Sequence, residues 1–208
     1  MTEKEKMISG RLYNSADKEL GTLRTNAHNL CKDYNDTYES EKVKRREILQ
    51  RLLPNSSQNI YIQGPIQFDY GIFTSFGEKC YANFNLVILD CCPIKIGNNV
   101  LFGPNCSLVT PIHPIFPDER KVRTAPDGSW YDYEYAKPIE IGNDCWLATN
   151  VTVCGGVKIG NGCIIGAGSV VTKDIPDNSF AAGNPCRVIR QITEKDRVKY
   201  KNIGNIPE

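Results

Sequence analysis

Bulky aliphatic side chains recur at every sixth position in the C-terminal half of the chain. This first track consists of Ile141, Leu147, Val153, Ile159, Ile165 and Val171. A second track, two positions earlier, holds medium-sized or small residues: Ile139, Cys145, Val151, Val157, Cys163, Ser169 and Ile175. Residues two positions apart lie on the same face of a strand, whereas no helix has a period of six. The two tracks therefore predict short strands separated by tight corners.

The corners carry glycine and asparagine, as in Gly142-Asn143, Gly160-Asn161-Gly162 and Gly166-Ala167-Gly168. These residue types supply the positive φ angles that tight corners need. The same rule appears upstream in two shorter series: Ile94, Val100 and Cys106 beside Ile96, Phe102 and Leu108. A repeat of six residues is typical of a β-helix whose coils stack about 4.8 Å apart. The predicted fold class is an all-β core, a single-stranded parallel β-helix of hexapeptide repeats.

Residues 1–57 have a different period and predict an N-terminal α-helical segment. Apolar residues recur there at helical spacing, at Leu20, Leu23, Ala27, Leu30 and Tyr34. We expect Ser15 to cap one helix and Ser40 to cap another, which ends at Pro54.

We place the β-helix at residues 58–188 and a C-terminal tail at residues 189–208. The six-residue register of the β-helix breaks once. Residues 111–137 follow neither track and predict a long loop excursion, which contains His113 and the turn signal Pro126-Asp127-Gly128. The excursion is rich in aromatic residues, namely Trp130, Tyr131, Tyr133 and Tyr135. Because long loops in compact domains are usually functional or disordered, this aromatic content favours a function.

The charge balance argues against one class of function. The 208 residues include 25 basic and 24 acidic side chains, with a formal net charge of +1. The chain therefore lacks the surplus of Lys and Arg that binds nucleic acid. No apolar run reaches the ~20 residues that span a bilayer, and residues 1–10 lack a signal-peptide core. We expect a soluble, cytoplasmic protein that binds neither nucleic acid nor membranes.

The cysteine and histidine counts limit the chemistry further. The nine cysteines are an odd number without a C-x-x-C pair, which argues against a zinc finger and a disulfide framework. We expect free thiols. His28 and His113 are the two histidines. A metal site with three histidine ligands, as in a β-helical carbonic anhydrase, is therefore excluded, and we expect no metal.

Five motifs, considered in addition to the repeat pattern, point to a family. They are Asp69-Tyr70-Gly71, Tyr81-Ala82-Asn83-Phe84-Asn85, His113-Pro114, Val171-Thr172-Lys173-Asp174-Ile175-Pro176 and Ala182-Gly183-Asn184-Pro185-Cys186-Arg187. With the N-terminal stretch from Glu3 to Asp17, the chain resembles the maltose and galactoside O-acetyltransferases of the hexapeptide-repeat superfamily, and the maltose branch in particular. The resemblance covers residues 3–193. It implies a left-handed coil, a homotrimer with sites between subunits, acetyl-CoA as donor and a sugar hydroxyl as acceptor.

His113 is the candidate catalytic residue. A hydroxyl is a weak nucleophile at neutral pH, and an imidazole, with an ordinary pKa of about 6.5, is suited to remove its proton. The resemblance implies that the acceptor oxygen then attacks the thioester directly, so that no acyl-enzyme forms. We expect His28, in the predicted helix, to be a solvated or packing side chain.

Acceptor contacts are implied at four positions. The resemblance assigns Asn83, whose amide both donates and accepts hydrogen bonds, and Asp69, where the galactoside branch carries a serine. Ser15 and Asp17 are further candidates from the N-terminal segment, and a structural role stays open for both.

Coenzyme A needs cations or backbone donors for its phosphates and a groove for its pantetheine arm. The resemblance places Thr149 and Ala167 along that arm, and the Thr149 amide is a candidate partner for the developing oxyanion. The other donor-side candidates are Thr172, Lys173, Arg187, Arg190 and Trp146. A structural role for Trp146 and a purely solvated role for the three cations stay open.

Other functions also stay open. A non-catalytic scaffold would use the same fold, and a xenobiotic or amino-sugar acceptor would suit the same donor side. Cys91 bears on the acceptor, because the galactoside pattern has a second carboxylate where this thiol follows Asp90. We expect Asp90 to be a buried structural carboxylate. The predicted activity is acetyl transfer to a hydroxyl of maltose, glucose or a galactoside-like sugar.

Overall fold

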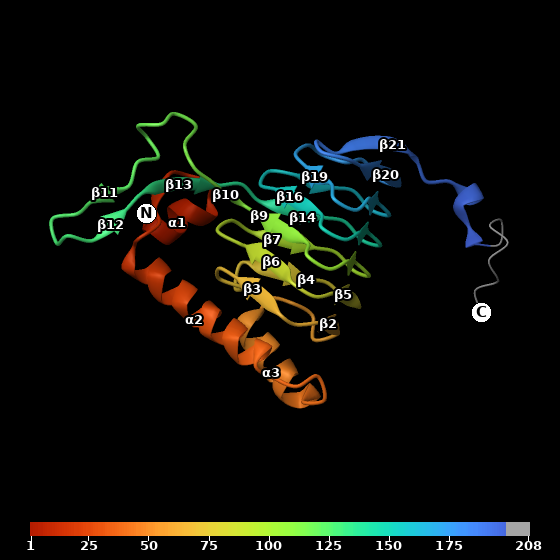
Figure 1. The fold of residues 1–208 in the computed structure, drawn as a ribbon, viewed down its shortest axis with the longest axis horizontal. Coiled ribbons are helices and arrows are strands. Elements are labelled where there is room, and N and C mark those ends of the chain that lie inside the picture. The colour runs from red at the N-terminus through yellow and green to blue at the C-terminus, as the bar shows by residue number, and fades with distance from the viewer. Residues whose placement is uncertain (199–208) are drawn as a thin grey trace.

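Short strands coil into a triangular prism, and two N-terminal helices lie against its first coil (Figure 1). The computed structural model describes residues 1–198. The helices are α1 (Glu3–Ile8), α2 (Lys18–Asn35), α3 (Lys42–Leu52) and the short 3-10 helix η1 (Glu194–Asp196). The prism has three sides, each a sheet of parallel strands contributed by successive coils.

We name the three sheets in the order in which the chain visits them. Sheet I contains β2 (Ile60–Ile62), β5 (Cys80–Ala82), β8 (Leu101–Phe102), β15 (Trp146–Leu147), β18 (Ile164–Ile165), β20 (Ser179–Ala182) and the antiparallel β21 (Arg187–Gln191). Sheet II contains β3 (Ile66–Phe68), β6 (Leu86–Leu89), β9 (Ser107–Val109), β16 (Thr152–Cys154) and β19 (Val170–Val171). Sheet III contains β4 (Thr74–Phe76), β7 (Ile94–Ile96), β14 (Ile139–Ile141) and β17 (Lys158–Ile159). The corners between them are edges I–II, II–III and III–I.

The two six-residue tracks form the interior of the prism, as the sequence predicts. Every member of both tracks is buried, and equivalent residues of successive coils pair in register, as Phe102, Leu147 and Ile165 do in sheet I. Stacked apolar side chains thus fill the space between the three sheets. The predicted fold class, a left-handed parallel β-helix with an N-terminal helical segment, is confirmed.

The prediction that the corner glycines supply positive φ angles is only partly right. Gly162 and Gly168 do have positive φ, but Gly142 and Gly160 do not. A Cβ on Gly142 would lie 2.7 Å from the backbone nitrogen of Asn161 in the next coil. Glycine is therefore needed there because adjacent coils approach too closely for a side chain.

The corner asparagines at edge III–I join successive coils. The side-chain Oδ1 of Asn143 accepts the N–H of Asn98, and Oδ1 of Asn161 accepts the N–H of Asn143, at 2.8 and 2.9 Å. Asp177 continues the ladder by accepting the N–H of Asn161. The repeated asparagine thus satisfies a corner amide that has no partner within its own coil.

The excursion is more ordered than its lack of a six-residue pattern suggested. It contains β10 (Pro111–Ile112), β11 (Arg123–Thr124), β12 (Trp130–Tyr131) and β13 (Tyr133–Ala136). Strand β13 pairs with β10 on one side and with the N-terminal β1 (Tyr13–Asn14) on the other, both antiparallel. Figure 1 shows the β11–β12 hairpin projecting away from the prism.

The inner faces of α2 and α3 complete the core at the first coil. Ala27, Cys31 and Tyr34 of α2 are buried in the same cluster as the prism interior. Helix α3 ends just before Pro54, as predicted, but its N-cap is Glu41 and not Ser40. Within residues 1–198, no helix has the length and apolar character needed to cross a membrane. Part of the predicted tail, residues 199–208, lies outside the described residues.

Candidate functional site

The excursion leaves the prism at edge II–III and places His113 beside two carboxylates. The His113 side chain, just after β10, is 56% exposed. Its Nδ1 lies 3.5 Å from Oδ2 of Asp132, and its Nε2 lies 3.9 Å from Oε2 of Glu134. These are ion-pair distances, longer than a good hydrogen bond. The imidazole thus lies between two acids from the returning part of the same excursion.

Glu134 is held by the N-terminal segment. The hydroxyl of Tyr13 donates a 2.5 Å hydrogen bond to its Oε1, which leaves Oε2 on the side of His113. Burial raises the pKa of Glu134, while the Tyr13 hydrogen bond and the proximity of His113 lower it in part. The proximity of His113 thus favours the carboxylate form of Glu134 against the effect of burial.

Asp132 is fixed from the same segment. The hydroxyl of Ser15 donates to Oδ1 of Asp132 at 2.5 Å, and the Ser15 N–H donates to its carbonyl. The prediction that Ser15 caps α2 is therefore wrong. Asp17 is the cap, and its Oδ1 accepts the N–H groups of Glu19 and Leu20.

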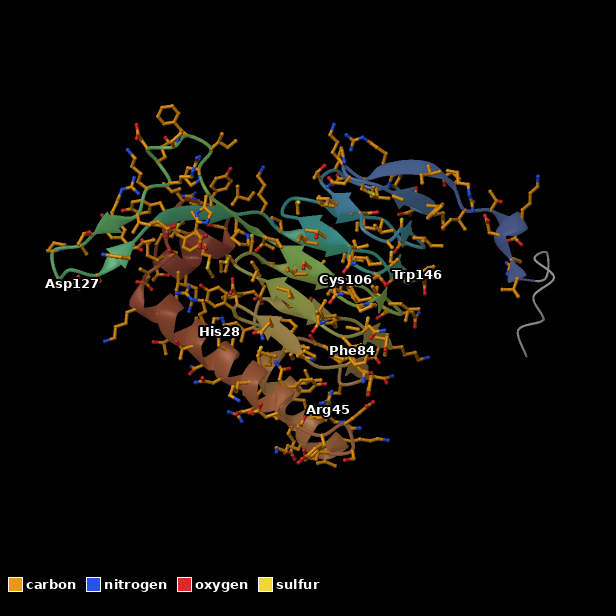
Figure 2. All side chains as sticks on the ribbon, viewed as in Figure 1. His28, Arg45, Phe84, Cys106, Asp127 and Trp146 are labelled. Carbon is orange, nitrogen blue, oxygen red and sulfur yellow. The ribbon has the colours of Figure 1, made fainter. Side chains whose placement is uncertain are left out.

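Asp69 stands on the same edge, two coils before the excursion. Its Oδ1 lies 3.8 Å from Nε2 of His28, and its Oδ2 accepts a 3.7 Å hydrogen bond from the thiol of Cys91. Burial raises the pKa of Asp69, partly offset by Cys91, His28 and Arg24. The sequence led us to expect a solvated or packing role for His28. His28, which Figure 2 labels, is half exposed, and its Nε2 also lies within ion-pair reach of Asp69.

Asp90 shapes the corner that carries Asp69. Its carboxylate is fully buried and accepts the N–H groups of Tyr70, Gly71 and Phe73 and the hydroxyl of Thr74. Burial raises the pKa of Asp90, and these hydrogen bonds offset part of that rise. The expectation of a structural carboxylate agrees with this geometry, which fixes the backbone directly after Asp69.

A second group of candidates lies along edge I–II. Asn83 follows β5 and its Oδ1 accepts the N–H of Phe84 at 2.8 Å, which leaves its NH₂ group free to donate. Thr149 and Ala167 occupy the same edge in later coils. Within residues 1–198, neither backbone N–H has an acceptor. Because exposed amides seek hydrogen-bond partners, this edge is suited to bind a ligand that carries carbonyl groups.

The other donor-side candidates are distributed over three places. Trp146 is 48% exposed on the outer side of sheet I (Figure 2). Thr172 and Lys173 are exposed on edge II–III after β19. Arg187 and Arg190 lie on β21, which folds back antiparallel on β20, and Arg190 pairs with Asp196.

Family models match several stretches of the chain. Residues 6–56 match the maltose acetyltransferase hexapeptide capping motif, residues 138–173 the bacterial transferase hexapeptide (six repeats), and residues 93–113 the hexapeptide repeat of succinyl-transferase. The galactoside O-acetyltransferase of Escherichia coli (strain K12) is 38% identical over 196 residues, which is 94% of this chain and 92% of that protein. The chain belongs to the family of galactoside and maltose O-acetyltransferases.

Solved structures of this family share the whole fold. A maltose O-acetyltransferase from Clostridium difficile 630 is 42% identical, with a TM-score of 0.85, over 93% of this chain and 99% of the other. A galactoside acetyltransferase in complex with coenzyme A is 36% identical, with a TM-score of 0.86, over 94% of each chain. The protein is therefore an acetyltransferase of this family.

Sequence reasoning missed the two acids beside His113. It singled out the aromatic residues of the excursion but not the acids between them. The order Tyr131-Asp132-Tyr133-Glu134-Tyr135 alternates with a period of two, which indicates a strand with tyrosines on one face and acids on the other. Tyr133 and Tyr135 do line a separate cavity, while the acids face His113.

Proposed function

We propose that the protein transfers an acetyl group from acetyl-CoA directly to a sugar hydroxyl, with His113 as general base. The support is the position of His113 between Asp132 and Glu134, in a chain of an O-acetyltransferase family with a relative that binds coenzyme A. We further propose that it acts as a cytoplasmic homotrimer without a metal, and that maltose, glucose or a galactoside-like sugar is the acceptor.

The proposed reaction balances without a further reactant. Nε2 of His113 takes the proton of the acceptor hydroxyl while the oxygen bonds to the thioester carbonyl carbon. When the intermediate collapses, the carbon–sulfur bond breaks and the proton passes from His113 to the leaving coenzyme A thiolate. Asp132 lies on the Nδ1 side, where it accepts the Nδ1 proton and so holds the tautomer in which Nε2 is the base. The contact between Asp132 and His113 shortens once substrate is bound, as is common for contacts in unliganded active sites. The free N–H of Thr149 stabilises the oxyanion.

The acceptor would bind between the acids of edge II–III and the amide of Asn83. Asp69 accepts from sugar hydroxyls, and the free NH₂ of Asn83 donates to a sugar oxygen. Ser15 and Asp17 complete the wall behind them, and both already make structural hydrogen bonds. For the donor, Ala167 and Trp146 would line the pantetheine arm of coenzyme A. Its phosphates would be bound by Lys173, together with the neighbouring Thr172, and by Arg187 and Arg190.

One chain does not bring these groups together, because His113 and Thr149 lie on opposite edges of sheet II. Its outward side chains are uncharged, with Val87, Ser107 and Thr152 paired in register. The outward side of sheet III instead carries Lys158 paired with Glu140. Three prisms that turn sheet II toward a threefold axis would place edge I–II of one chain beside edge II–III of the next. We therefore propose that each site forms between subunits.

His113→Ala tests the proposal. We expect kcat to fall by about 10² to 10⁴, the usual contribution of a general base, while binding of coenzyme A measured by calorimetry is unchanged. His28→Ala is the matched control and should retain most of the activity. Full activity of the His113→Ala variant would exclude His113 as the general base. If the parent protein transfers no acetyl group from acetyl-CoA to any of a panel of sugars, amino sugars and other hydroxyl acceptors, a non-catalytic scaffold is favoured.

A further inference from the structure

A cavity lined by none of the residues proposed for acetyl transfer lies between α3, the loop before it and the first coil of the prism. Its volume is about 210 Å³. Leu49, Leu53 and Ile62 supply an apolar wall, and Arg45, which is labelled in Figure 2, also lines the cavity. The cavity thus combines an apolar wall with a cation that α3 carries on its inner face.

Arg45 is buried, with 8% of its surface exposed, and its charge has no direct counterion. Its guanidinium donates to three neutral oxygens: Oγ1 of Thr37 at 3.0 Å, the hydroxyl of Tyr34 at 2.8 Å and the carbonyl of Ile62 at 3.2 Å. It also stacks over the Tyr34 ring at 4.2 Å. Throughout the described chain, no carboxylate oxygen lies within ion-pair distance of it. A guanidinium has five N–H donors, so two remain unused.

The other charges around the cavity are mostly positive. Lys42 and Arg46 line it, are exposed, and form no ion pair within residues 1–198. Glu39 is the one carboxylate among the lining residues, and its Oε1 accepts the hydroxyl of Tyr61 at 2.6 Å. Three cations therefore face one acid. The charge of Glu39 interacts with those of Arg45 and Lys42, but a net positive charge remains around the cavity. Since a buried charge without a carboxylate in direct contact is unfavourable, the cavity has a physical reason to attract an anion.

We propose that this cavity is a binding site for a small organic anion, a carboxylate or phosphate carried on a compact apolar body. The anionic group pairs with Arg45 and the exposed cations Lys42 and Arg46, and the body packs on Leu49 and Leu53. The size agrees, because a cavity of about 150 Å³ accommodates benzene. The site is distinct from edges I–II and II–III, which carry the residues proposed for acetyl transfer.

The test uses benzoate and phenyl phosphate as probes and benzamide as the neutral counterpart of benzoate. Binding to the full-length protein is followed by calorimetry at constant ionic strength, with and without coenzyme A. We expect at least one anion to bind with or without coenzyme A, and benzamide to bind at least about tenfold more weakly, because each charge-assisted contact accounts for about a factor of ten or more.

Paired variants separate this site from general electrostatic attraction. The double variant Lys42→Ala with Arg46→Ala should weaken anion binding about tenfold or more without changing acetyl transfer. Lys44→Ala with Arg51→Ala removes the same charge from α3 outside the cavity and should leave binding unchanged. The proposal is overturned if neither anion binds at about 10 mM, if benzamide binds equally well, or if both double variants lose the same affinity.

Discussion

The interior of the prism and its edge II–III differ in the kind of side chain that they carry. The interior tracks contain no charged residue, and identical positions of successive coils stack in register. Edge II–III, where the repeat is interrupted, carries His113 beside Asp132 and Glu134, and also Asp69. The regular part therefore provides rigidity, whereas the departures from regularity provide the titratable groups.

Charged side chains lie at the edge and not in the interior because of the free-energy cost of desolvating a charge. A charge inside a narrow, stacked core would have no partner and would cost several kcal/mol, by order of magnitude. At the edge, the N-terminal segment supplies partners instead, because the hydroxyls of Tyr13 and Ser15 donate to Glu134 and Asp132. Met7, Leu20 and Ala136 pack beneath them as a second apolar cluster, which keeps these donors in place.

Removal of an interior side chain should have the largest effect on stability. Leu147 is fully buried between coils, so Leu147→Ala should lower the free energy of unfolding by about 2–5 kcal/mol. Leu101 pairs beside Trp146 on the outer side of the same sheet and is about half exposed, so Leu101→Ala should change it by less than about 0.5 kcal/mol. Urea denaturation measures both. Equal losses would contradict the assignment of an inner and an outer face.

Replacement of glycine by alanine should change the stability of the protein in opposite directions in the prism and in the helical segment. Gly142→Ala places a Cβ against backbone atoms of the next coil and should destabilise by about 1–3 kcal/mol. Gly21 lies in α2, and a Cβ added there would meet no heavy atom within 4 Å, so Gly21→Ala should stabilise by about 0.5–1 kcal/mol. Thermal unfolding of both variants tests this. A stabilised Gly142→Ala protein would show that coils do not approach closely at edge III–I.

The smallest expected effect is on the pH dependence of stability, to which Glu134 at edge II–III contributes. Because the folded pKa of Glu134 lies above its usual 4.5, the folded state binds the proton more tightly than the unfolded one. Its contribution is favourable at low pH and is lost as the pH rises from the usual value through the raised value. Glu134→Gln cannot ionise and should retain the Tyr13 hydrogen bond.

The measurement for Glu134→Gln is the Tm at several pH values. The variant should be more stable than the parent at pH 8 and similar at pH 4, so its profile should be flatter. Some slope should persist, because the pKa of Asp69 is also raised by burial. A Tm difference that does not change with pH would show that Glu134 titrates normally in the folded protein.

The site was predicted unevenly from the sequence, and particular residues show why. His113 stood out because it lies between prolines in a segment that breaks the repeat, and the structure places acids next to it. Asp132 and Ser15 are 117 positions apart, yet they share a hydrogen bond, and no local pattern indicates that pairing. The proximity of His28 to Asp69 could not be predicted for the same reason, because Asp69 belongs to the prism and not to the helix that carries His28.

The hexapeptide repeat alone determined the prism, its interior residues and the place where the chain leaves it, because a period of six is a local property that each coil repeats. Only the tertiary structure decided which charges meet at edge II–III and which buried arginine lacks a counterion. Such contacts depend on where distant segments dock, and docking is fixed by packing of the whole chain, whereas the repeat reports only on neighbours from one coil to the next.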